Sequence, residues 1–348
     1  MISTFTSVSP VLKKKRPSSQ EPLLQPREVT PLSLRCLTSP DCLENLKVEE
    51  DIIQKDSLIQ TIPYGSVTRG EKGEEVSDIE ELKNHTRYFS DDGVGFHNLE
   101  VLKKALYLIK KNNLFLASHA EDAFYKTREE GEYLEVRREI ELAKEVGLPY
   151  HFCHMSTKES FDAIREAQKE GLNITCEVTP HHLFLNKNDI INSNFKMNPP
   201  LRSIKDQEAT LQALLDGTCN IIASDHAPHT KEEKEREYEK CPNGIIGLET
   251  TAPLVYTNLV KKGLISYQRF EDILSNNPRR LMGLNPLKIE VGKEATCCCL
   301  DISSLHTYEE KEILSKGKNS PFLGKSFYGF NFLTLFKGKA VYVKELDK

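Results

Sequence analysis

Six short apolar segments alternate with charged segments of helical period, and this alternation constrains the fold more than any other feature. The apolar segments are LIQTIPYGSV (58–67), TRYFS (86–90), NLFLASH (113–119), LPYHFCH (148–154), LNITCEV (172–178) and CNIIASD (219–225). Their length and their content of Ile, Leu, Val and Phe predict buried strands. Because predicted helices separate them, the strands are expected to belong to βα units of a parallel sheet.

The segments between the strands carry helix signals. Apolar residues recur at three- and four-residue steps in 98–111 and 133–147, and the segment 158–171 ends in a glycine. Ser77 and Glu80 have the spacing of a capping box. Six repeats favour an α/β fold of the (β/α)₈ TIM-type barrel over an open doubly wound sheet. No GxGxxG follows an early strand, which disfavours a nucleotide-binding domain.

The pattern changes at both ends of the chain. After about residue 285 short β segments are joined by Gly turns, so residues 286–348 are predicted to form a small β appendage behind a barrel spanning 43–285. Residues 1–42 show no repeating hydrophobic face and no apolar core of a signal peptide. We expect this first segment to be aberrant and disordered, and the barrel to be incomplete at its N-terminal strands.

The composition excludes several classes of protein. The 348 residues include 47 basic and 52 acidic side chains, a net charge of −5, which gives no basis for nucleic-acid or membrane binding. No apolar run is long enough to span a bilayer. The nine cysteines are an odd number and are scattered except for Cys297–Cys299, which fits a reducing cytosol. We expect a cytoplasmic protein that acts on a small molecule.

Polar side chains follow one predicted strand after another. They are Asp91 and Asp92, His119, His154, His181 and His182, and finally Asp225, His226 and His229. A single His after a strand is more often a hydrogen-bonded loop residue than a ligand, and an Asp-Asp-Gly is more often a turn. Such coincidences at successive strand ends are harder to explain, because these ends converge on the catalytic face of a barrel. Imidazole and carboxylate ligands fit a zinc-type site.

Seven motifs occur in an order that resembles one family. SDDG, HAED, HFCHMSTK, EVTPHHL, FKMNPPLRS, IIASDHAPHT and GIIGLETTAPLVYTNLV are similar to those of dihydroorotases of the amidohydrolase superfamily, in particular the bacterial type whose bridging metal ligand is an aspartate. The resemblance covers about residues 46 to 345. NPPLR, SDHAPH and GLET distinguish it from hydantoinases and allantoinases, which share the metal site.

The resemblance implies roles for eight residues. Four would bind one or two Zn²⁺ ions: Asp92 as the bridging carboxylate, His119 and His154 on the second ion, and Asp225 on the first. Four would contact the substrate: Asn198, His229, Asn243 and Gly244. The implied reaction is the reversible hydrolysis of dihydroorotate to N-carbamoyl-aspartate in pyrimidine biosynthesis, with Asp225 also carrying the proton.

The chain departs from the family where a His-x-His motif followed by Arg is expected. Its first histidine is His85, and no Met-Pro-Asn substrate motif follows the second strand position. Codons able to encode MISTFTSVSPVLKKK read DIHVHLREPGFE in a shifted frame, so we hypothesise that residues 1–42 are a wrong-frame translation. The same shift would make Cys297–Cys299 misread leucines. For residues 1–42, the rival interpretations are a disordered arm and a nuclear-localisation-like patch at Lys13–Arg16. For Cys297–Cys299, the rival interpretation is a metal-binding knuckle of thiols.

A second departure concerns the spacing of two predicted metal ligands. Only 35 positions separate His119 from His154, fewer than the family leads us to expect. We therefore expect a loop and part of a helix to be trimmed there, with an altered pocket wall.

Three functions remain open. The first function is a dihydroorotase with impaired activity. The second is a non-catalytic subunit that scaffolds aspartate carbamoyltransferase, and the third is another cyclic amidohydrolase such as a hydantoinase or allantoinase. Survival of the four predicted metal ligands argues against the scaffold. A homodimer or an association with aspartate carbamoyltransferase is the expected assembly.

Overall fold

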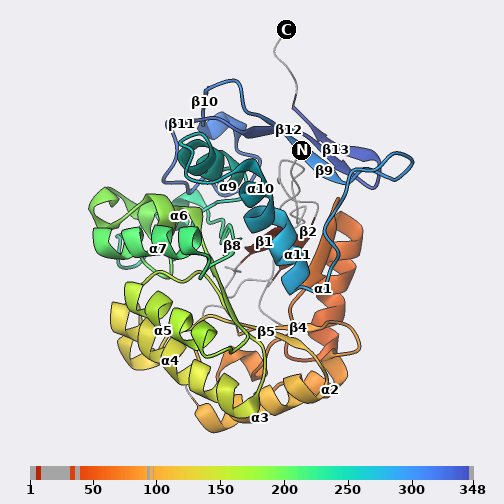
Figure 1. Cartoon of the computed structure of the whole chain (residues 1–348), viewed down its shortest axis with the longest axis vertical. Helices are drawn as coiled ribbons and strands as arrows, with labels where there is room; N and C mark the ends of the chain where they lie inside the picture. Colours follow the sequence, from red (N-terminus) through yellow and green to blue (C-terminus); the bar gives the residue numbers. More distant parts are fainter. Residues whose placement is uncertain (1–4, 9–31, 36–39, 92–94, 97, 345–348) are drawn as a thin grey trace.

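A computed structural model describes residues 5–8, 32–35, 40–91, 95–96 and 98–344 (Figure 1). Within these ranges eight short strands follow one another in parallel. They are β1 (Phe5–Val8), β2 (Leu32–Arg35), β3 (Gln60–Pro63), β4 (Tyr88–Phe89), β5 (Phe115–Ser118), β6 (Tyr150–Phe152), β7 (Ile174–Val178) and β8 (Ile221–Ile222). Strands β1–β3 form one sheet and β4–β8 another, and a parallel bridge between Gly65 and Phe89 connects them. Each of the six predicted strand segments contains one of these strands.

The N-terminal strands differ from the expectation of an incomplete barrel. Strand β1 pairs in parallel with β2, and β2 pairs in parallel with β3, so two four-residue strands precede the first predicted one. The hypothesis of a wrong reading frame concerns residues 1–42, most of which lie outside the described ranges. It therefore stays a hypothesis, as do the boundaries of the three predicted segments.

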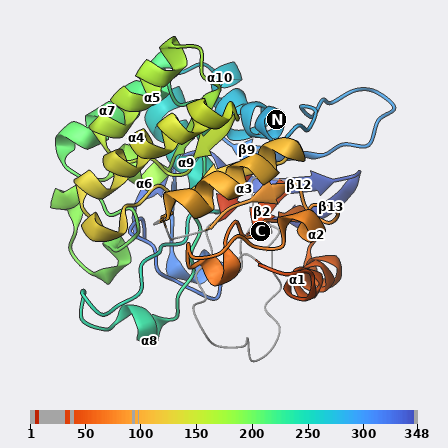
Figure 2. The ribbon, with the colours of Figure 1, turned by 90° about the horizontal axis from the view of Figure 1, so that it is seen from below.

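Helices surround the strands on the outside. They are α1 (Leu43–Asp56), α2 (Ile79–Leu82), α3 (Leu99–Lys111), α4 (Glu129–Val146), α5 (Lys158–Lys169), α6 (Pro180–Phe184), α7 (Ile204–Asp216), α8 (Lys231–Lys234), α9 (Thr251–Val255), α10 (Tyr267–Glu271) and α11 (Asn277–Leu281). Figures 1 and 2 show α3, α4 and α5 side by side along one flank. The helices predicted over 98–111, 133–147 and 158–171 are confirmed as α3, α4 and α5.

Short helical turns complete the connections. The 3₁₀ turns are η1 (Arg69–Glu71), η2 (Ala123–Tyr125), η3 (Lys187–Asp189), η4 (Ser193–Phe195) and η7 (Glu310–Glu312), and the π-helical turns are η5 (Tyr256–Val260) and η6 (Asp272–Asn276). The π turn η5 directly continues α9, and η6 directly links α10 to α11.

Side-chain caps explain where two of the helices begin. The Asn98 side chain accepts hydrogen bonds from the amides of Glu100 and Val101, which satisfies two N–H groups that the first turn of α3 leaves free. Thr157 caps α5 in the same way. The capping box predicted from Ser77 is wrong: α2 begins at Ile79, and its N-cap residue is Asp78, which makes no side-chain cap. The Ser77 hydroxyl donates to the carbonyl of Ser66.

The main core lies between the strands and the outer helices. It includes Phe89, Tyr150, Phe152 and Phe161, each at most 1% exposed. Alternate residues along a strand point to opposite faces, so neighbours of these residues point to the interior of the barrel. A separate small cluster of Tyr64, Tyr88, Ala117 and Met282, with Phe115 and Cys153 packed against it, fills that interior.

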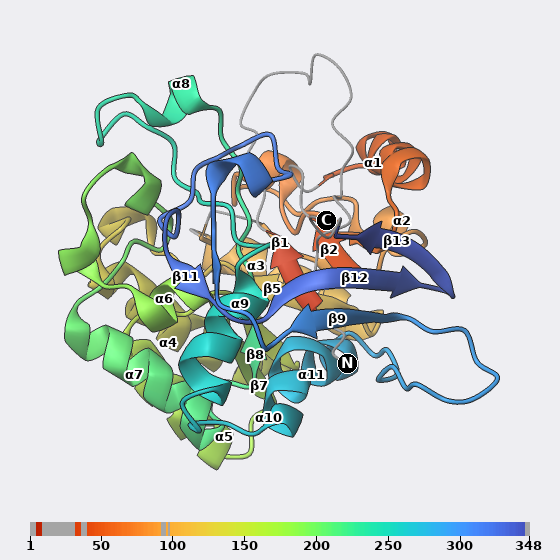
Figure 3. The same ribbon diagram turned by 90° about the horizontal axis from the view of Figure 1, so that it is seen from above.

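The C-terminal appendage is confirmed as a small β structure. Strands β9 (Cys297–Asp301), β12 (Phe330–Phe336) and β13 (Lys339–Val343) form an antiparallel sheet, and β10 (His306–Thr307) pairs with β11 (Ser326–Phe327). Figure 3 shows the sheet beside α11, with a loop projecting between α11 and β9. Cys298 is fully buried in the main core. An apolar environment at this position is compatible with a leucine, and its thiol belongs to no metal-ligand group among the described residues.

Candidate active site

Three of the predicted metal ligands sit directly beyond strand ends. His119 follows β5, His154 comes two residues after β6, and Asp225 comes three residues after β8. His154 and Asp225 have φ angles of 37° and 47°, in the left-handed region that residues other than Gly rarely adopt. Such a conformation costs about 1–3 kcal/mol and persists where surrounding contacts enforce it, typically at functional sites.

His119 and His154 meet inside the mouth of the barrel. Nδ1 of His119 lies 2.8 Å from Nε2 of His154, and both side chains are buried. Burial, followed by the nearby charges of His119 and His182, holds the pKa of His154 well below its usual value. The imidazole of His154 is therefore neutral at physiological pH, which is the form that binds a metal ion.

Asp225 joins this pair through a further histidine. Its Oδ2 lies 3.9 Å from Nε2 of His181, whose pKa burial holds well below its usual value, with His182 and His154 adding to the effect. Nε2 of His181 and Nδ1 of His154 are buried and have no hydrogen-bond partner. Buried polar atoms without partners point to a ligand or ion that belongs with them. The donor set therefore fits a divalent cation such as Zn²⁺.

The structure describes one of the two aspartates of SDDG, Asp91, but not the other, Asp92. Asp92, the predicted bridging ligand, lies outside the described residues, so its role stays a prediction. The Asp91 carboxylate accepts hydrogen bonds from the amides of Val67 and Thr68, at 2.7 and 3.0 Å, and from the Thr68 hydroxyl. Asp91 thus holds the segment that follows β3.

Asn198 reaches the histidine pair from a different loop. Its Nδ2 lies 3.2 Å from Nε2 of His119 and donates to Oε2 of Glu121, also at 3.2 Å. Glu121 further accepts the amide of Thr127 at 2.7 Å. Burial alone would raise the pKa of Glu121, but the contacts with His119, Thr127 and Asn198 lower it to about 2. The sequence interpretation missed Glu121, although it stands two positions after His119 in the HAED motif.

The remaining predicted substrate residues form one group. His229 Nε2 donates to the carbonyl of Asn243 at 2.7 Å. Gly244 has a φ of 130°, and a Cβ there would lie 2.6 Å from the Cβ of Ala227, so only glycine fits. The Gly244 amide donates to the carbonyl of Lys196 at 2.9 Å, which connects this group to the loop that carries Asn198.

Two residues that sequence reasoning missed hold these loops together. Asn319, in the appendage, accepts the His229 amide at 2.9 Å and donates to the carbonyls of Ala227 and Gly244 at 2.9 and 3.0 Å. Buried Lys234 donates to three carbonyls, those of Lys196, Pro242 and Gly244, and shares the last with Asn319. No local pattern marks either residue, because their partners lie in other loops.

The predicted residues are thus close but do not form one compact ligand set. His119, His154 and Asn198 adjoin, and Asp225 approaches them through His181. Among the described residues, one group offers three metal-ligand atoms within 4.8 Å of one another. That group is His151, Cys153 and Glu177, none of which was predicted.

Comparison with known proteins identifies relatives by sequence. No model of a protein family matches the chain. A dihydroorotase of Bacillus cytotoxicus is 39% identical over 327 residues, which cover 88% of this chain and 76% of the relative. A dihydroorotase of Staphylococcus epidermidis is 38% identical over 327 residues, covering 88% of this chain and 77% of the relative.

Solved structures share the fold. The L-hydantoinase (dihydropyrimidinase) from Arthrobacter aurescens matches with a TM-score of 0.84 at 22% identity, over 99% of this chain and 85% of its own. The dihydropyrimidinase from Brevibacillus agri matches with a TM-score of 0.79 at 22% identity, over 91% and 78%. These likenesses confirm the predicted TIM-type barrel fold. The sequence relatives go further: at 38–39% identity over 88% of its length, the chain belongs to the dihydroorotase family.

Proposed function

We propose that this chain is a dihydroorotase, which interconverts dihydroorotate and N-carbamoyl-aspartate, with activity reduced by the missing His-x-His motif. The observation that carries the proposal is the buried chain of His119, His154, His181 and Asp225 at the strand ends of a dihydroorotase-family barrel. Two of its imidazoles have nitrogen atoms without a partner, as residues prepared for a cation would.

The residues present would hold Zn²⁺ in two positions. Asp225 would bind the first ion, His119 and His154 would bind the second, and Asp92 would bridge the two. When bound, such ions lower the pKa of water so that hydroxide forms near neutral pH, and they polarise a carbonyl. The first histidine of the chain is His85, so the first ion has fewer protein ligands than the family motif provides.

The side chains at the mouth would move the proton and orient the ring. The Asp225 carboxylate would take the proton from the attacking oxygen and deliver it to the ring nitrogen as the C–N bond breaks. In ring closure the same steps run in reverse. Asn198, His229, Asn243 and Gly244 would contact the substrate, and the contacts of Asn319 and Lys234 would keep their loops in place.

The test compares the chain as given with a version whose first 42 residues carry the shifted-frame sequence. Zinc content and hydrolysis of dihydroorotate are measured for both. We expect little turnover by the first and clear turnover by the second. In the second, Asp225→Asn and His119→Asn should each lower the rate by about 100-fold or more, since each removes a group that acts on metal or proton.

His306→Asn is the matched control, because His306 lies in the appendage and bonds Glu312. His306→Asn should change the rate of dihydroorotate hydrolysis by no more than about twofold, because the residue is remote from the site of the reaction. Undiminished turnover in Asp225→Asn would refute the assignment of the proton carrier. Turnover of hydantoin without dihydroorotate would favour another cyclic amidohydrolase. Absence of zinc from both chains, together with binding to aspartate carbamoyltransferase, would favour the scaffold.

A further inference from the structure

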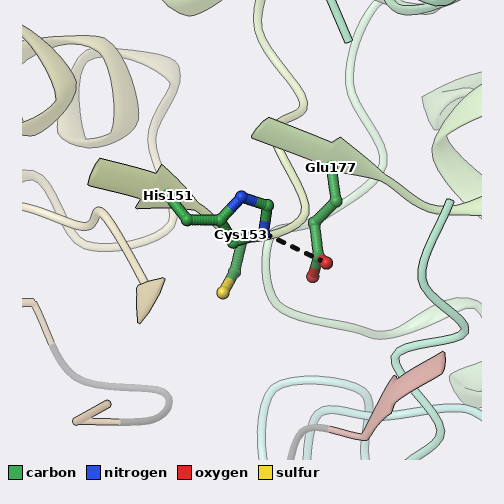
Figure 4. A group of neighbouring side chains, drawn as sticks. All are labelled: His151, Cys153 and Glu177. Carbon is green, nitrogen blue, oxygen red and sulfur yellow. Dashed lines mark hydrogen bonds and ion pairs between the residues drawn. The ribbon is translucent and has the colours of Figure 1, made fainter. Parts of the chain in front are cut away.

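We propose that His151, Cys153 and Glu177 form a thiolate-containing Zn²⁺ site inside the barrel, separate from the ligands predicted at the mouth. Each residue offers one ligand atom, and these atoms all lie within 4.8 Å of one another. Figure 4 shows His151 directed at the carboxylate of Glu177, with Cys153 beside it. None of the three belongs to the residues that the family resemblance assigns to metal binding.

The register of two neighbouring strands brings the three side chains together. Strands β6 and β7 are parallel, and His151 pairs with Thr175, two residues before Glu177. Tyr150 and Phe152 belong to the outer core, so His151 must point to the barrel interior. There its ring lies 5.8 Å from that of Phe115. Cys153 packs against the same interior cluster.

Two hydrogen bonds orient the ring of His151. Its Nδ1 lies 2.9 Å from the Thr175 hydroxyl oxygen, and its Nε2 lies 3.3 Å from Oε2 of Glu177. Nε2 is therefore the nitrogen that a metal ion shared with the Glu177 carboxylate would bind.

A proton on Nε2 can join this nitrogen to the Glu177 carboxylate, or a metal ion can take the place of that proton. The nearby thiol of Cys153 favours the metal. It can bind a metal ion as a third ligand, whereas it adds no comparable interaction to a hydrogen bond between His151 and Glu177. The bond from Nδ1 to Thr175 is also the arrangement that orients metal-binding histidines in proteins. The two buried side chains, His151 at 3% and Glu177 at 1% exposure, would otherwise hold an ion pair largely removed from water.

The donor set selects the kind of ion. One imidazole nitrogen, one thiolate and one carboxylate oxygen suit Zn²⁺, whereas Mg²⁺ and Ca²⁺ prefer oxygen ligands alone. On binding, the Cys153 thiol would release its proton to solvent and bond as thiolate. Three protein ligands leave a fourth position for water. Cys153 is half-buried, whereas His151 and Glu177 are buried.

Cobalt titration of the full chain tests the site independently of any turnover. Co²⁺ bound to a thiolate gives a charge-transfer band in the near ultraviolet that imidazole and carboxylate ligands do not give. We expect this band to appear during the titration and to saturate at one thiolate-bound Co²⁺ per chain, to be displaced by Zn²⁺, and to be lost in Cys153→Ser. His151→Gln keeps the thiol and should weaken Co²⁺ binding by about 10-fold or more.

Two variants serve as controls, with folding checked by circular dichroism. Cys176→Ser removes a thiol on the outer face of β7 that bonds the Thr218 carbonyl, and it should keep the band. His119→Asn alters the mouth and should also keep it. The proposal is overturned by the absence of the band in the parent chain, by its persistence in Cys153→Ser, or by its loss in His119→Asn. Should Cys153→Ser not fold, unchanged Co²⁺ affinity in His151→Gln overturns it instead.

Discussion

The outer helical layer buries mainly apolar side chains, whereas the mouth of the barrel buries polar ones. On the outer layer, apolar residues such as Phe161 pack against strands, and side-chain caps such as Asn98 satisfy the helix ends. At the mouth, polar groups are buried and two imidazole nitrogens, on His154 and His181, have no partner. Packing of the first kind stabilises the fold, whereas burial of the second kind costs free energy that only a bound ligand recovers.

The largest expected effect comes from emptying the outer layer. Phe161→Ala removes a ring that is 1% exposed in α5, and we expect the free energy of unfolding to fall by about 3–5 kcal/mol. Phe124 is 91% exposed, so Phe124→Ala should change it by no more than about 0.5 kcal/mol. Chemical denaturation measures both. Equal effects of the two changes would contradict the view that this layer carries the stability.

A smaller and local effect is expected where the appendage meets the mouth. Asn319→Ala leaves the His229 amide and the carbonyls of Ala227 and Gly244 without their partner, which costs about 1–3 kcal/mol. Hydrogen exchange should accelerate in 225–247 and stay unchanged in β4–β7. Exposed Asn188→Ala is the control and should accelerate neither. Faster exchange throughout the barrel would show that the two regions are not separable.

The smallest effect belongs to the solvent-exposed side of the outer layer. Glu80 accepts hydrogen bonds from Lys83, Lys111 and Asn112, which lower its pKa to about 2. Since this pKa lies below the usual value, the contribution of Glu80 to stability is present above about pH 4.5 and is lost as the pH falls through about 2. The difference in unfolding free energy between the parent and Glu80→Gln should therefore shrink from pH 5 to pH 2. Glu81→Gln, on the same helix, should show no such trend.

The fold was largely predictable because its signals are local. Apolar runs such as 148–154 and 172–178 became β6 and β7, and the periodic segments 98–111 and 158–171 became α3 and α5. Strands β1 and β2 were not predicted, because their residues show neither apolar runs nor a clear period. The capping box at Ser77 failed for another reason: α2 begins at Ile79, so Asp78 rather than Ser77 occupies the N-cap position.

The candidate site was predictable only in part. Family motifs located His119, His154, Asn198 and Asp225, and the structure places the first three in contact. They could not locate Asn319, whose partner amide at His229 is 90 positions away in the sequence. The group of His151, Cys153 and Glu177 was equally hidden, because it depends on the register between two strands.

The hydrogen bonds of Asn319 to the loops of the mouth have a consequence for how ligand preference can differ between related chains. Under the proposed function the appendage would take part in substrate recognition, since the Asn319 side-chain amide bonds the backbone of His229 and Gly244. Exchange of this C-terminal module between relatives would therefore alter ligand preference even where every residue of the barrel stays the same.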